Sequence, residues 1–569
     1  IRDSLSTIQI GVLNAIDVQG LTTAEVSVLN SRQMGAFTND AITGLNTAQV
    51  STLSSLQVSG LQTAQVNVLT SAEVGAFTTL VVRGLSTMQI GVLTADALRG
   101  LSVDQVAVLK GPQVGGLTLD QLTSLSSVQI GALSTSGVRG FTTAQLSSLT
   151  NTTVLGFGTQ QIAAFTSSQL IGFTPDTLSG LTADQVGALS AVQVGGLTTL
   201  QVGALTSDQL GSFTTAAVKG LTTGQIGVLD ALDVSGFTTS EVSVLTTTQL
   251  RGVPVDSIAG FSTNAMVTMS SAQIAGFTSS QLAAMSPEQV LVLSTAGIRG
   301  LSTSQMAALK VETVAQLSTA QINALRSAQL AALTVDQIGV LSSTQIGAIA
   351  SVSIVGLQSA QVAVFDVVDF SGFSSAQVTA FSTKQLSSFS NDDLGWLSSA
   401  QLAGLTNTQL TSLTTNQIGS LTNIAGVTST SLKGLTSMQL AALTEGQVTT
   451  LTVSQMSVLT ATQIKGLEGT DAAVLNHDQI AALAKATVTA LTTSAISSLN
   501  GDALSGFSAA QLTSLTTTQV GSFTNDQLAA FSDASLEAFT AKQVAVFRPL
   551  QLASILSPSQ LAAIYSGNN

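Results

Sequence analysis

The stretch Leu21–Val50, LTTAEVSVLNSRQMGAFTNDAITGLNTAQV, repeats one eight-residue phrase with small changes. Each octad begins with Leu or Phe, continues with Ser or Thr, and carries Gln or a similar residue three places later, followed by an aliphatic residue. We number the octad so that Leu21 is position 1, Thr22 is position 2, Glu25 is position 5 and Val26 is position 6. Repeats of this kind decide the whole architecture of a chain.

The register of the octad predicts how the chain is organised. It holds from Leu5 to Ser420, so we treat residues 1–420 as one continuous octad array. Residues 421–426 (LTNIAG) are two residues short and are expected to bend or offset the array. Octads resume over residues 427–554, and residues 555–569 hold one extra residue, a last octad and a tail. We therefore expect no separate second domain.

Composition narrows the class of protein. Apolar residues make up 44% of the chain and charged residues only 8%, against about a quarter in an average globular domain. No apolar run reaches the roughly 18 residues of a membrane-spanning helix, so we expect no membrane insertion. A net charge of −13 argues against nucleic-acid binding, and the absence of Cys excludes disulfides and thiolate metal sites. Because the chain opens at Ile1 without a signal peptide, we expect a piece of a longer product.

The spacing of the apolar positions favours short helices over strands. Positions 1 and 6 are separated alternately by five and three residues, whereas a half-buried strand would alternate strictly. One long helix also fails, because its apolar stripe would drift about 80° with every octad. The sequence therefore predicts an all-α solenoid with one short capped helix per octad. The alternative is a β-solenoid, which the many Thr, Val and Ile residues would suit.

Positions 2 and 5 together form a capping box. The hydroxyl accepts from the backbone N–H three residues later, and the side chain at position 5 accepts from the N–H of position 2. We expect Thr22, Thr38, Thr174 and Ser286, all at position 2, to act as structural caps. Proline supports the boundary, since Pro175 and Pro287 stand at position 3, the first helical residue, where proline is favoured.

Glycine at position 8 predicts the corner of the solenoid. Such glycines recur every 40 residues, as at Gly20, Gly60, Gly100 and Gly140, with a second series interleaved, so the mean step is 20 residues. We infer a solenoid turn of about 20 residues, or 2.5 octads. Glycine would end each helix in a left-handed conformation and allow backbones to pass closely at the corner.

Phrases of the LTxxQV type, such as LSTAQI at Leu317–Ile322, resemble the octad arrays of giant secreted bacterial cell-surface proteins. Those proteins are often described as adhesin-like or as haem utilisation or adhesion proteins. The resemblance extends over nearly the whole chain and implies an extracellular location at the cell surface. The glycine-rich calcium nonapeptides that usually accompany type I export are absent from this sequence.

The sequence offers little that predicts chemistry. His477 has no second His or Cys near it, and the pair Asp392–Asp393 reads as a helix first turn rather than a metal site. Haem binding has no Cys and no Met/His ligand pair. We therefore predict no enzyme, no catalytic or metal residue and no cofactor. Trp396 and Tyr565 are candidates for an interface, with local packing as the better-supported role.

Three functions remain open. We expect an extracellular structural protein that builds a stiff rod, fibre, sheath or surface layer by self-association. The alternative is the spacer stalk of a large bacterial adhesin whose ligand-binding part lies outside this segment. A third reading is an ice- or glycan-binding surface made of Thr rows, although the hydroxyls at position 2 are already used as caps. Expected partners are copies of the chain itself, and then cell-surface glycans or other surface proteins.

Overall fold

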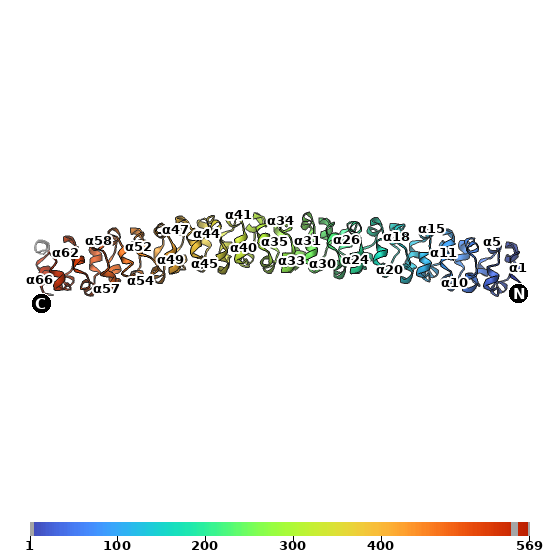
Figure 1. The fold of residues 1–569 in the computed structure, drawn as a ribbon, viewed down its shortest axis with the longest axis horizontal. Coiled ribbons are helices and arrows are strands. Elements are labelled where there is room, and N and C mark those ends of the chain that lie inside the picture. Colours follow the sequence, from blue (N-terminus) through green and yellow to red (C-terminus); the bar gives the residue numbers. More distant parts are fainter. Residues whose placement is uncertain (1–4, 548–555, 567–569) are drawn as a thin grey trace. The chain divides into compact units, whose positions relative to one another are not determined.

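A computed structural model describes residues 5–547 and 556–566. The chain falls into two compact units, Ile1–Leu293 and Ser294–Asn569. The described residues contain helices and no strand, so the all-α solenoid is confirmed over the β-solenoid. In each unit the short helices follow one another in chain order, as the colours of Figure 1 show. Pro549 and the extra residue Ile555 lie outside the described residues.

Each octad folds into one short helix that begins at position 3. Typical examples are α3 (Thr23–Ser27), α21 (Ser167–Leu170) and α24 (Ala191–Gly196) in the first unit, and α48 (Ser399–Leu402) in the second. Helices this short are far below the length that is stable alone in water, so packing must hold them in place. Within the described residues, four segments are 3-10 helices instead: η1 (Val255–Gly260), η2 (Ser351–Gly356), η3 (Ile424–Gly426) and η4 (Ile464–Gly466). The last element is α66 (Pro558–Ser566).

The core consists of the side chains at positions 1 and 6. Val26 is fully buried and Leu29 is 4% exposed, and this pairing recurs through both units. Phenylalanines at position 1 stack edge to face, as Phe157 does on Phe165 with ring centroids 5.3 Å apart. The Phe-rich stretch near the C-terminal end packs in the same way. Phe531 and Phe539 are both buried, and their ring centroids lie 5.7 Å apart. These rings belong to the core.

The solenoid turn is longer than the glycine spacing suggests. In the first unit α24 packs on α27 (Thr215–Gly220), and in the second α55 (Gly469–Ala473) packs on α58 (Thr493–Ser498), three octads on. Side-chain hydrogen bonds between regular turns most often join residues 28 and 31 apart, as from Gln49 to Leu21 and Val18. The predicted turn of 20 residues, or 2.5 octads, is therefore wrong. One turn takes about 28 residues, or three and a half octads.

Candidate functional site

The side chain at position 5 performs two tasks at once. In Gln201, Oε1 accepts from the N–H of Thr198 at 2.8 Å, which closes the start of its own helix. Its Nε2 donates to the carbonyls of Leu170 and Phe173, both at 2.8 Å, in the preceding turn. Those carbonyls stand at and just beyond the end of α21, where helices leave carbonyls unpaired. One amide thus satisfies the beginning of one helix and the end of another.

This pattern repeats through both units, and we call it the glutamine ladder, meaning the buried Gln side chains at position 5. In the second unit Gln329 donates to the carbonyls of Ile298 and Leu301, both at 2.8 Å. Gln201 and Gln329 are 2% and 3% exposed. Because each amide is buried and fully paired, removing it would leave backbone groups without partners at a cost of about 1–3 kcal/mol for each one.

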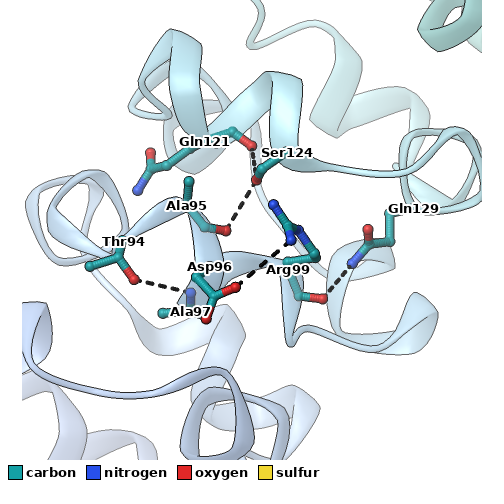
Figure 2. Close-up of polar contacts among 8 residues, drawn as sticks. All are labelled: Thr94, Ala95, Asp96, Ala97, Arg99, Gln121, Ser124 and Gln129. Carbon is teal, nitrogen blue, oxygen red and sulfur yellow. Dashed lines mark hydrogen bonds and ion pairs between the residues drawn. The ribbon is translucent and has the colours of Figure 1, made fainter.

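Figure 2 shows the surroundings of one rung of the ladder. Gln129 Nε2 donates to the carbonyl of Arg99 at 3.2 Å, and Thr94 Oγ1 caps the helix α12 (Ala95–Arg99) by accepting from the N–H of Ala97 at 3.0 Å. Ser124 Oγ lies between turns, within 3.1 Å of the Ala95 carbonyl. The Arg99 guanidinium nitrogen lies 3.8 Å from Asp96 Oδ1, but both side chains are well exposed, so this ion pair contributes little to stability.

Short hydroxyl side chains replace the amide in some octads. Ser257 Oγ donates to the carbonyl of Leu229 at 2.8 Å, and Ser353 Oγ donates to the carbonyl of Leu325 at 2.7 Å, in each case 28 residues back. These serines keep the link between turns and lose the reciprocal cap. They stand in η1 and η2, the two six-residue 3-10 helices, so these two exceptions to the octad helix coincide with a missing position-5 amide.

All four predicted cap residues stand at helix N-termini. Thr22 accepts from the N–H of Glu25 at 3.2 Å and Thr38 from that of Ala41 at 3.1 Å. Thr174 accepts from Thr177 at 3.1 Å, and Ser286 accepts from Gln289 at 3.3 Å. Pro175 and Pro287 occupy the first helical residue, as expected from the missing proline N–H.

Glycine at position 8 serves close packing, and its predicted left-handed conformation is wrong. Among the described residues no glycine has positive φ, and Gly100 has φ −68°. A Cβ on Gly100 would lie 2.7 Å from the carbonyl carbon and 2.8 Å from the Cα of Ser71 in the preceding turn. The expectation that backbones pass closely at these glycines is therefore confirmed, for a steric reason rather than a dihedral one.

The short octad of residues 421–426 contains its own replacement for the missing glutamine. Asn423 Nδ2 donates to the carbonyl of Leu397 at 2.9 Å, a position-1 carbonyl of the kind that the ladder normally serves. The next turn adjusts by two residues: Gln447 donates to Leu421 and Ile418, which lie 26 and 29 residues back. At Gln455 the spacing is 28 and 31 again. The deletion is absorbed within one turn.

Acidic residues stand at position 5 in several octads. Hydrogen bonds from the backbone and side chain of Thr22 lower the pKa of Glu25, which lies in the first described turn and is solvated. Burial raises the pKa of Asp233, Asp369 and Asp471, each of which also has a second acid near its carboxyl. A carboxylate can accept at the cap but cannot donate to the preceding turn, so it performs only half of the glutamine's task.

His477 has polar neighbours that the sequence did not predict. Its Nδ1 lies 2.8 Å from Ser505 Oγ, and its backbone N–H donates to the carboxylate of Asp502 at 3.0 Å. The Ser505 hydroxyl donates to the carbonyl of Asp502 at 2.7 Å, so its proton is not directed to the imidazole. The carboxylate binds the backbone of His477 and not the ring. This geometry links two neighbouring turns and does not activate a nucleophile.

The two acids Asp392 and Asp393 lie in the first turn of α47 (Asn391–Gly395). Asp393 accepts from the N–H of Ser390 at 2.7 Å and so completes a capping box. In the described part of the chain, no group of three or more His, Cys, Asp or Glu residues could hold a metal ion. Nor does any described helix have the length and apolar character needed to cross a membrane.

Trp396, one of the two candidate interface residues, follows α47 and packs against the core. Its ring lies 5.8 Å from that of Phe370, which is fully buried, while 39% of Trp396 stays exposed. Local packing thus accounts for most of this side chain. Tyr565 falls within α66, but its side chain lies outside the described residues.

Comparison with known proteins agrees with the octad pattern. Residues 287–319, 314–343 and 389–423 match the model of the ALTTAQ repeat. The chain is a repeat protein. No curated protein matches it.

Among solved structures, similarity is reported to the structure of APUM23-GGAUUUGACGG, at 14% identity over 85% of this chain and 93% of that one, with a TM-score of 0.16. Kap121p bound to Nup53p gives 10% identity over 100% and 76% of the two chains, with a TM-score of 0.15. Such low scores carry no argument about fold or function.

Proposed function

We propose that this protein is an extracellular structural component that builds a stiff rod, fibre, sheath or surface layer by association of its octad solenoids. The support is the glutamine ladder. In most octads of both units, a buried glutamine at position 5 ties one turn to the turn before it. Repeat arrays in which every unit contacts its neighbours gain stiffness and length from such links.

The short octad supports association of copies with one another. Residues 421–426 show that this fold absorbs a deletion of two residues within one turn. The fold alone therefore does not require the unbroken register of the 52 octads before it. A surface that must match a second copy over a long distance would require it, because each shift would displace every later contact. Uniform duplication of the array is the competing explanation.

Exposed apolar side chains at position 4, which recur within each unit, are the groups that such contacts would use. Val192, Leu200 and Val352 are 77%, 75% and 83% exposed, on a surface with few charges to keep copies apart. The second candidate function is the spacer stalk of a bacterial adhesin. It is favoured by the resemblance of the octads to those of secreted surface proteins, and it needs length but no lateral contact.

The two functions differ in the mass of the protein in solution. We expect the full chain to form assemblies whose mass grows with concentration in sedimentation experiments, and filaments or sheets in electron micrographs. Replacing Val192, Leu200 and Val352 together by Glu is expected to disperse them, while replacement by Thr has a smaller effect at the same circular dichroism. Monomers at every concentration and salt condition would favour the stalk.

A further inference from the structure

Glu241 occupies a rung of the glutamine ladder but lacks the amide. It lies in α30 (Thr239–Val244), and its residue is 2% exposed. One carboxyl oxygen, Oε2, accepts from the N–H of Thr238 at 2.6 Å, as the glutamine Oε1 does elsewhere. The cap is therefore complete, and the other oxygen occupies the place of the amide nitrogen.

That other oxygen, Oε1, has no hydrogen-bond partner. In the described part of the chain it is the buried side-chain N or O atom left unsatisfied. Gln225, two octads before Glu241, donates to the carbonyls of Leu197 and Val194. Gln249, one octad after it, donates to those of Leu221 and Val218. In both cases the acceptors lie 28 and 31 residues back. The same register sets Glu241 against the carbonyls of Phe213 and Leu210. An ionised carboxylate and a carbonyl are both acceptors, so neither can satisfy the other.

Burial raises the pKa of Glu241, because its charged form is poorly solvated between two turns. Helix α27, which packs on one side of α30, carries the exposed Lys219, and α32 (Thr263–Thr268) on the other side carries no charged residue. Along the chain, the nearest charged residues in the two flanking octads are Asp233 and Arg251. In the preceding turn, Asp208 lies two residues before Leu210. The leading cause of the shift is burial and not a neighbouring charge.

We propose that Glu241 is a proton-gated clasp between two turns of the first unit. When the carboxyl takes up a proton from solvent, Oε1 becomes a donor and bonds to the carbonyl of Phe213 or Leu210, which reproduces the link that glutamine makes elsewhere. When the carboxyl is ionised, this link is absent and two acceptors face each other. The turn junction at Glu241 is then weaker than the glutamine rungs at Gln225 and Gln249.

The direction of the pH effect follows from the raised pKa. The unfolded chain has the ordinary glutamate pKa of 4.5, and the folded chain has a higher one. Protonation therefore favours the folded junction. The stabilisation is complete below the unfolded pKa and is lost as the pH rises through the folded pKa. Above that value the junction opens more readily than its neighbours.

Hydrogen exchange of the full chain, corrected for intrinsic rates, tests this proposal together with ¹³C NMR of labelled glutamate carboxyls. We expect the Glu241 carboxyl to titrate above 4.5. We expect amides of α27 and α30 to gain about fivefold in protection as the pH falls through that titration, the change expected for one hydrogen bond. Glu241→Gln, which restores the usual rung, should be well protected at all pH values.

Two further variants make the test specific. Gln249→Glu should create the same pH dependence one octad later, while Glu25→Gln, at a solvated carboxyl with no described turn before it, should leave the protection of α27 and α30 and its pH dependence unchanged. An unaltered pH profile in Glu241→Gln, or a Glu241 carboxyl that titrates at or below 4.5, would overturn the proposal. So would full protection at pH 7 on adding Ca²⁺, because a cation would then be the bound group in place of a proton.

Discussion

The regular octad Leu197–Ala204 and the short octad Leu421–Gly426 reach the same result by different side chains. In the regular octad, Gln201 both caps its helix and donates to two carbonyls of the preceding turn. In the short one, Asn423 donates to a single such carbonyl, and the helix shrinks to the three residues of η3. The link between turns is kept and the helical cap is given up. Octads such as that of Thr38 and Ala41 do the reverse and keep the cap without the amide link, so the two functions of glutamine can be separated.

The largest expected effect comes from filling the close approach between turns. Gly100→Val would force a side chain into the backbone of Ser71, and we expect it to destabilise the protein by about 3 kcal/mol. Gly426→Val should cost a similar amount, because a Cβ there would lie 2.7 Å from the Cβ of Ser399. Urea unfolding followed by circular dichroism measures both.

Gly224→Ala is the matched control for these two variants. A Cβ at Gly224 would meet nothing closer than 3.9 Å, so this change should be neutral or slightly stabilising. If Gly426→Val were also neutral, the short octad would not keep the close packing of the regular ones, and the comparison would fail at this point.

Removing the inter-turn donor should have the next largest effect. Gln201→Leu leaves the Thr198 N–H and the Phe173 carbonyl unpaired, while the Leu170 carbonyl keeps the Phe173 N–H, and we expect a loss of about 2–3 kcal/mol. Asn423→Ala removes the bond to the Leu397 carbonyl and a second bond to Thr422 Oγ1 at an exposed site, and should cost about 1 kcal/mol. Gln160→Leu, at an exposed position of α20 (Thr159–Ala164), is the control and should stay within about 0.5 kcal/mol of the parent. Equal costs for Gln201→Leu and Gln160→Leu would show that the ladder contributes nothing.

Removing a cap should have the smallest effect. Thr38→Ala loses the bond to the Ala41 N–H and should cost about 1 kcal/mol, with faster hydrogen exchange at Ala41. The exposed neighbour Asn39→Ala is the control. In the short octad, the hydroxyl of Thr422 donates to the Gly395 carbonyl at 2.7 Å and is not a helix cap. Thr422→Ala should therefore weaken the contact between turns without exposing any helix N-terminus.

The octad helices and their caps could be predicted because both partners lie within one octad. A hydroxyl at position 2, an acceptor at position 5 and proline at position 3 are visible three residues apart. The second role of glutamine could not be predicted, since its carbonyl partners are 28 and 31 residues away and nothing local marks them. The sequence gives one sign of the role of Asn423, because Asn423 is the one amide side chain in the short octad that lacks the glutamine.

The predicted turn length is wrong because the glycine spacing is not the period of the solenoid. Gly100 is needed because a Cβ there would overlap the backbone of Ser71, 29 residues back, and glycine is absent at many other helix ends. The 20-residue mean step therefore does not report the turn. The contact of His477 with Ser505 joins neighbouring turns, so it could not be predicted from the sequence.

The glutamine ladder also determines the order in which the chain can fold as it emerges with its N-terminus first. Every rung reaches back only about one turn, so a new octad finds all its partners as soon as some 30 residues before it are in place. No segment has to wait for a distant part of the chain, and such local pairing favours fast folding. The finished end of the solenoid serves as a template for the next octad, and growth can proceed stepwise from the N-terminus, whatever the final length of the array.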